Sequence, residues 1–147
     1  MISKNIDNQD QTSLYAELLI SGEFLKKGEL DSIVGSCPHK MVEKGGNIGR
    51  TLLIAKEGEA RWATPEVVSD DGRVEIEKLF QIFESRIQEI SKYCKDKNYE
   101  VQVSLVIFPF GEDFPSIFLP EDLVGRITAL NASFYVDVIG FSNRNEE

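Results

Sequence analysis

The sequence predicts a single α+β domain in which helices pack on one face of a mainly antiparallel or mixed sheet. Segments with strand-like alternation and segments with helix-like spacing follow each other along the chain. The length of 147 residues is that of one domain, and no linker interrupts residues 13–142. We expect residues 1–12, which are poor in apolar side chains, to form a flexible N-terminus, and residues 143–147 to form a flexible acidic tail.

The first half of the chain predicts a strand, a short helix and a hairpin. The apolar residues that alternate in the strand are Leu14, Ala16, Leu18 and Ile20. Gly22 ends this strand, and Gly35 follows residues 30–34 at the place where a helix commonly ends in a left-handed residue. After a turn-rich stretch, residues 51–55 and 59–63 predict the two strands of a hairpin.

The second half predicts a long helix packed against a central strand. We expect the helix over residues 74–97, capped at its start by Asp70 or Asp71 and ended by Asn98. Its apolar face consists of Ile76, Leu79, Phe80, Phe83, Ile87, Ile90 and Cys94. Residues 99–108 carry apolar side chains on both sides, which is typical of a central strand.

An irregular segment, a helix and a closing strand complete the chain. Pro120 suits the first position of the helix, whose buried stripe is Leu123, Ile127 and Leu130. Residues 133–141 predict the strand, with Phe134, Val136 and Val138 pointing inward. The first six elements are compatible with a ferredoxin-like βαββαβ unit, to which the last helix and strand are added.

The net charge of the chain indicates which classes of partner it can bind. The formal net charge is −9, and residues 99–147 carry 2 basic and 8 acidic groups. This charge argues against binding to nucleic acids or anionic membranes and is compatible with a basic protein partner. The chain shows no secretory signal and no apolar run of about 20 residues, so we expect a cytoplasmic location.

No catalytic, cofactor or metal motif is recognisable. His39 is the one histidine, and Cys37 is the nearest candidate nucleophile, so a Cys37–His39 pair is the enzymatic alternative. Residues 44–50 are rich in glycine but precede a strand, which excludes a P-loop. A small anion held there by backbone amides with Lys44 and Arg50 would make the chain a regulatory ligand-binding domain. We expect no enzyme activity, no cofactor and no metal.

The candidate partner-binding residues are acidic or aromatic. They are Glu112, Asp113, Phe114, Glu121, Asp122 and Trp62. The carboxylates would meet a basic surface, and Trp62 or Phe114 would serve as an anchor. Each has a simpler structural explanation, because carboxylates suit turns and helix starts and Trp62 suits the core.

A spaced pattern of glycine, proline, aromatic and apolar residues runs along the chain. It consists of Tyr15, Ile20, Gly22, Gly35, Pro38, Lys44, Gly45, Trp62, Pro115, Ile117, Leu119, Leu123, Ile127 and residues 137–139. This pattern resembles that of the bacterial DUF4279 family, a domain of unknown function. The resemblance covers about residues 14–141 and implies the family's fold, but no catalytic residues.

Small acidic domains of this type occur beside polymorphic and contact-dependent toxins, where they are regarded as immunity proteins. The hypothesis that follows is a non-enzymatic immunity protein that binds and neutralises a basic toxin domain encoded nearby.

Overall fold

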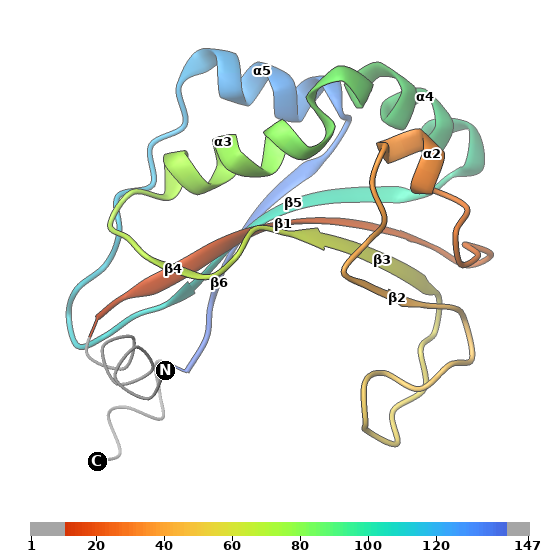
Figure 1. Cartoon of the computed structure of the whole chain (residues 1–147), viewed down its shortest axis with the longest axis horizontal. Coiled ribbons are helices and arrows are strands. Elements are labelled where there is room, and N and C mark those ends of the chain that lie inside the picture. Colours follow the sequence, from red (N-terminus) through yellow and green to blue (C-terminus); the bar gives the residue numbers. More distant parts are fainter. Residues whose placement is uncertain (1–10, 141–147) are drawn as a thin grey trace.

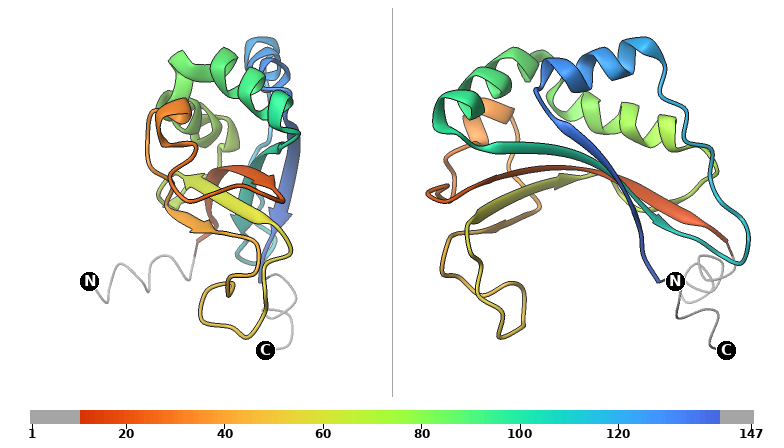
Figure 2. Two further views of the ribbon diagram at one scale, coloured as in Figure 1. Left: turned by 90° about the vertical axis from the view of Figure 1, so that its right-hand side faces the viewer. Right: turned by 180° about the vertical axis from the view of Figure 1, so that it is seen from behind.

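The structure is a computed structural model that describes residues 11–140 (Figure 1). Its six strands form one mixed sheet, and the described helices lie on one face of that sheet (Figures 1 and 2). The predicted α+β architecture is therefore confirmed. Residues 1–10 and 143–147 of the predicted flexible ends lie outside the described residues, whereas Thr12 is buried and belongs to the packed domain.

The strand order of the sheet is that of a ferredoxin-like unit with one strand added. Across the sheet the strands are β2 (Lys40–Val42), β3 (Gly58–Ala63), β1 (Ser13–Gly22), β5 (Glu100–Phe108) and β6 (Ser133–Val138), and β4 (Val67–Val68) pairs with the start of β1. From β2 to β5 all neighbours are antiparallel, so β1 and β2 are parallel with β3 between them. This is the split βαβ arrangement. β6 then adds to β5 in parallel.

The helices are α2 (Asp31–Val34), α3 (Gly72–Phe83), α4 (Ile87–Lys97) and α5 (Glu121–Ala129). A 3₁₀ turn over Glu84–Arg86 separates α3 from α4, so the single helix predicted over 74–97 is in fact two helices inclined to each other (Figure 1). The Asp71 side chain accepts a hydrogen bond from the Arg73 amide at 3.1 Å and caps α3 as predicted. Pro120 is the N-cap of α5 and not its first helical residue.

The core lies between the helices and the sheet. The alternating residues of β1 are all buried, which confirms the predicted strand. The largest fully buried side chains are Trp62, Phe80, Phe83, Leu14, Leu18, Ile20, Leu25, Ile76, Leu79, Ile90, Leu105 and Ile107. Trp62 also donates its indole N–H to the Ser36 carbonyl at 2.9 Å, so its one polar atom is satisfied inside the core.

The predicted hairpin of residues 51–55 and 59–63 is wrong. β3 pairs with β1 on one side and with β2 on the other, and residues 43–57 form a loop that extends beyond the sheet (Figure 1). At the end of this loop Leu52 and Leu53 are 95% and 65% exposed. Their apolar character resembles that of a strand, but within the described chain only an isolated bridge between Asn47 and Ile54 forms there.

The predicted inward orientation of β6 is confirmed, but two of its three inward residues are not buried. Phe134 packs against the core, whereas Val136 and Val138 are 39% and 44% exposed. Both valines are on the helix-facing side, because they pair in register with the buried Leu105 and Ile107. The helices do not cover that end of β6, so its side chains stay in solvent.

Candidate functional site

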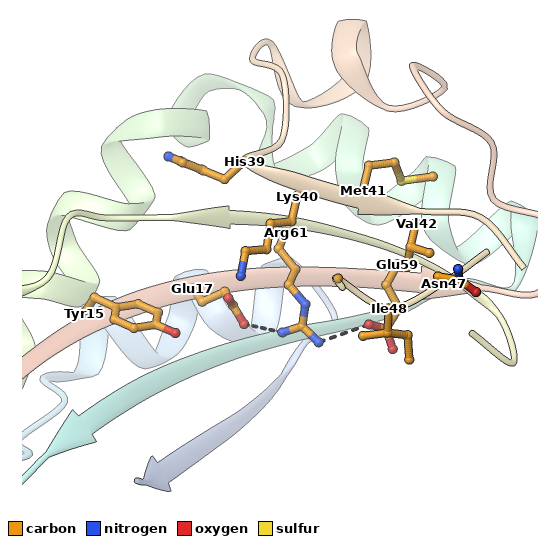
Figure 3. A pocket seen from close by; sticks show the side chains of 11 residues that line it. Tyr15, Glu17, His39, Lys40, Met41, Val42, Asn47, Ile48, Glu59 and Arg61 are labelled. Atoms are coloured by element: carbon orange, nitrogen blue, oxygen red, sulfur yellow. Dashed lines mark hydrogen bonds and ion pairs between the residues drawn. The ribbon is translucent and has the colours of Figure 1, made fainter. Parts of the chain in front are cut away.

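A groove lies on the face of the sheet that is turned away from the helices (Figure 3). It has a volume of about 630 Å³, and Asn47, Ile48 and Gly49 of the 43–57 loop form one of its walls. Its main polar lining residues are Tyr15, Glu17, Lys40, Asn47, Glu59 and Arg61. These side chains reach the groove because the residues that alternate with them on β1 and β3 are buried in the core.

The Arg61 guanidinium occupies the centre of the groove. It donates to Glu17 at 2.6 Å and to Glu59 at 3.1 Å, so carboxylates from two strands hold it (Figure 3). Burial alone would lower the pKa of Arg61, but the charges of Glu17 and Glu59 outweigh burial and hold the pKa above its ordinary value. Arg61 is therefore a fixed, neutralised cation and not an open anion site.

The other groove residues offer hydrogen bonding but little acid–base chemistry. Burial, and then the nearby Glu17 charge, raises the pKa of Tyr15, so this phenol stays protonated at neutral pH. Lys40 points into the groove and makes no ion pair with the described residues (Figure 3). The groove is thus lined by hydrogen-bonding and charged side chains of β1, β2 and β3 that could hold a polar ligand.

Except for Trp62, the predicted acidic and aromatic residues lie on the segment that joins β5 to α5 and at the start of α5, along one edge of the molecule (Figure 1). We call this surface the acidic–aromatic edge; it consists of Phe110, Glu112, Asp113, Phe114, Phe118, Glu121 and Asp122. All of these residues are exposed. Asp122 pairs with Arg126 at 3.0 Å one turn along α5, whereas the other three carboxylates make no ion pair with residues 11–140.

Trp62 is the exception among the predicted partner-binding residues. Its exposed fraction is 0%, and it points into the core on the side of the sheet opposite the groove. Trp62 therefore cannot serve as a surface anchor. The aromatic rings that do reach solvent near the carboxylates are Phe110, Phe114 and Phe118, which are 41%, 50% and 66% exposed.

The Cys37–His39 pair does not form a nucleophile and base in this arrangement. The Cys37 thiol lies 3.4 Å from an Asp31 oxygen, and this hydrogen bond, with the Asp31 charge, raises the pKa of the thiol. His39 Nδ1 accepts a hydrogen bond from the Ala63 amide at 3.1 Å. A raised thiol pKa lowers the fraction of reactive thiolate at neutral pH, and His39 is oriented by β3.

The 44–50 loop does not present a free anion cradle. The amides of Gly45 and Ile48 donate to the carbonyls of Ala55 and Leu53, both at 2.9 Å. Lys44 pairs with Glu23. These bonds hold the loop together and leave fewer donors for an anion.

The described chain offers neither a cluster of metal-binding side chains nor a membrane-spanning helix. Residues 11–140 contain no cluster of three or more His, Cys, Asp or Glu side chains that could hold a metal ion. Among the described helices, none has the length and apolar character needed to cross a membrane.

Sequence reasoning missed the groove, although one signal for it was present. Glu17, Glu59 and Arg61 occupy alternate positions on strands whose other positions are apolar, which marks the side of the sheet away from the core. That signal gives the side of each strand. It does not give the strand order that places Arg61 between the two carboxylates.

The comparisons with known proteins agree with the fold and add no activity. The family model described as domain of unknown function, DUF4279, matches residues 12–140. No curated protein and no solved structure matches the sequence significantly. The matched range contains every strand and helix of the described chain, from β1 to β6. The chain therefore belongs to the DUF4279 family.

Proposed function

We propose that this protein is a non-enzymatic binding domain, an immunity protein that neutralises a cognate toxin by covering the toxin's functional surface. The observation that carries the proposal is the composition of the acidic–aromatic edge. Three partly exposed phenylalanine rings stand among carboxylates within one short segment. We further propose that the complex forms in the cytoplasm, with a protein and not a nucleic acid or a membrane as the partner.

The exposed rings support a protein partner. A phenylalanine that stays half or two-thirds exposed in the folded chain keeps apolar surface in water at a free-energy cost, which a partner removes by covering it. Aromatic side chains are also enriched in protein interfaces. Phe114 and Phe118 are the two most exposed rings of the edge, so they are the expected anchors.

The carboxylates support a basic partner. Glu112, Asp113 and Glu121 make no ion pair with the described residues, so a cationic surface can meet them without displacing an internal partner. The net charge of −9 adds a long-range attraction for such a surface. Complementary charge of this kind speeds association and opposes wrong partners.

The other candidate sites favour binding over catalysis. The Cys37 thiol is held protonated by Asp31, and the Arg61 guanidinium is neutralised by Glu17 and Glu59. A role in proton transfer or nucleophilic attack would need one of these groups to be released first. The acidic–aromatic edge needs no such rearrangement to bind.

Co-expression with the product of the neighbouring gene tests the proposal. We expect that product to be toxic alone, to be harmless when this protein is present, and to co-purify with it. The double variant Glu112→Lys/Asp113→Lys should weaken the complex about tenfold or more, as should Phe114→Ala.

A matched control separates the edge from net charge. The double variant Glu89→Lys/Asp96→Lys makes the same change in charge on α4, at the other end of the molecule (Figure 1). This control should bind nearly as well as the original chain. A neighbouring product that is not toxic, or a complex that the edge variants leave intact, would show that the proposal is wrong.

A further inference from the structure

β6 is an edge strand of the sheet, and its outer side lacks the features that usually prevent another strand from pairing with it. Among residues 11–140, β6 pairs with β5 alone, so no described strand pairs with its outer side. Exposed edges in natural sheets usually carry lysine, proline, a bulge or a covering segment, which prevent another strand from adding. The sequence of β6, Ser-Phe-Tyr-Val-Asp-Val, contains neither lysine nor proline. The opposite edge strand, β2, is three residues long and offers a much shorter template.

The hydrogen bonds of β6 show which residues face outward. The Ile139 amide donates to the Ile107 carbonyl of β5 at 2.9 Å. Because backbone groups alternate sides along a strand, the amides and carbonyls of Tyr135 and Asp137 also point towards β5. Those of Phe134, Val136 and Val138 therefore point away from the sheet, along the free edge.

From this geometry we propose that a second copy of this chain binds along β6, antiparallel to it, with the two-fold axis at Val136. In this register Val136 faces Val136 of the second copy, and Phe134 faces Val138 of the second copy. These pairs join all the outward backbone groups of β6 to outward groups of its copy. One continuous sheet then runs through both copies.

The side chains of β6 are complementary to themselves in this register. On the helix-facing side all the opposed residues are apolar. The second copy would bury Val136 and Val138, which the helices do not cover. On the other side Tyr135 faces Asp137 of the second copy, so a phenol can donate to a carboxylate. Asp137 is the one charge on β6, and it never opposes its own copy.

The oligomeric state of the purified chain tests this proposal, which is independent of the proposed function. Sedimentation velocity over a concentration series should show a monomer–dimer equilibrium. Val136→Lys and Val136→Glu each place like charges opposite each other across the two-fold axis, and each should raise the dissociation constant of the dimer about tenfold or more. Mixing the two variants should restore a heterodimer, because lysine then faces glutamate.

Two controls keep folding separate from pairing. Val68→Lys adds the same charge at a valine of similar exposure, 42%, on β4, and should leave the dimer intact. Thermal unfolding of the monomer should be nearly the same for the Val136 and Val68 variants. A wild-type chain that stays monomeric, a dimer that both Val136 variants leave intact, or a mixture that stays monomeric would each overturn the proposal.

Discussion

The Glu29 carboxylate receives three hydrogen bonds at the end of the sheet where β1 meets α4. Tyr93 and Tyr99 donate their hydroxyls to one oxygen at 2.6 Å and 2.7 Å, and the Lys26 amide donates to the other at 2.9 Å. Burial would raise the pKa of Glu29, but the hydrogen bonds from Tyr93, Tyr99 and the Lys26 amide, with the Lys97 charge, together outweigh burial and lower the pKa below its ordinary value of 4.5. The carboxylate in turn raises the pKa of Tyr93 to about 12 and, together with burial, raises that of Tyr99.

This cluster makes stability depend on pH at both ends of the scale. Because the pKa of Glu29 is lowered by folding, its contribution is present above pH 4.5 and is lost as the pH falls through the lowered value. The tyrosine pKa values are raised by folding, so their contribution is present below pH 10.0 and is lost as the pH rises towards about 12. Both losses have one origin, the hydrogen bonds to Glu29.

The variant Tyr93→Phe/Tyr99→Phe should therefore lose stability at neutral pH, by about 1 kcal/mol per hydroxyl, and should also lose part of the pH dependence. Urea unfolding at about pH 3, 7 and 11 measures both effects. Tyr135→Phe is the control when all variants are compared at a protein concentration at which the chain is monomeric, since Tyr135 is exposed and makes no hydrogen bond within the described chain. The account would be contradicted if the free energy of unfolding changed between acid and neutral pH by the same amount in the double variant as in the original chain.

Where the end of β1 pairs with the start of β3, neighbouring atoms leave no room for a side chain, so both strands carry glycine. Gly22 and Gly58 face each other in register. A Cβ on Gly22 would lie 2.1 Å from a ring carbon of Tyr99, and a Cβ on Gly58 would lie 2.7 Å from the Leu25 carbonyl oxygen. Gly22 is one of the residues on which the family resemblance rests, and its role is to let the Tyr99 ring lie against the strand.

We expect Gly58→Ala to destabilise the protein by about 1–3 kcal/mol, because backbone and not a flexible side chain would have to move. Gly125→Ala is the opposite case, since Gly125 lies within α5 with no atom near its missing Cβ. It should stabilise the protein by about 0.5–1 kcal/mol through helix propensity. Chemical denaturation measures the change in the free energy of unfolding for each variant. Equal changes in the two variants would contradict the explanation from Cβ contacts.

The sequence predicted a strand correctly where the spacing of apolar residues alone shows which side chains are buried. The alternation in β1 and the two-sided apolar pattern of β5 correspond to strands in the middle of the sheet. The prediction failed where pairing depended on residues far along the chain. Met41 and its neighbours in β2 show no pattern of their own, and they become a strand because β3 lies beside them.

The break between α3 and α4 escaped prediction for a different reason. The apolar spacing from Phe83 to Ile87 is helical, so the sequence pattern continues through the 3₁₀ turn. Arg86, in that turn, donates to the Ser32 carbonyl at 2.9 Å and joins the helix break to α2. Such a contact depends on tertiary structure. The exposure of the carboxylates at the acidic–aromatic edge agrees with the sequence analysis. For Trp62 the core alternative is confirmed, and the surface-anchor alternative is wrong.

Across the whole molecule the acidic charge is the property that acts at long range. The net charge of −9 attracts a basic protein over distances of about the Debye length, which is roughly 8 Å at physiological ionic strength. The same attraction disfavours polyanions such as nucleic acids. In the proposed complex, this charge would favour a basic partner before any contact forms.

If the proposed toxin complex forms, its association rate should fall about tenfold or more between roughly 0.02 M and 0.3 M salt, while the dissociation rate changes little. Stopped-flow mixing at several salt concentrations measures this dependence. Glu112→Lys/Asp113→Lys should reduce the slope more than Glu89→Lys/Asp96→Lys does, because the first pair lies at the proposed contact. An association rate that does not depend on salt would contradict electrostatic steering.

The loop over residues 43–57 has a consequence for how the chain can be reconnected. Its two ends are joined by hydrogen bonds between Gly46 and Ala55 and between Gly45 and Ala55, and everything beyond them, including the fully exposed Leu52, lies outside the core. The beginning of β1 and the end of β6 lie at the same end of the sheet, on either side of β5 (Figure 1). A circular permutant that joins the original termini and begins at Leu53 would keep every strand pairing of the native sheet.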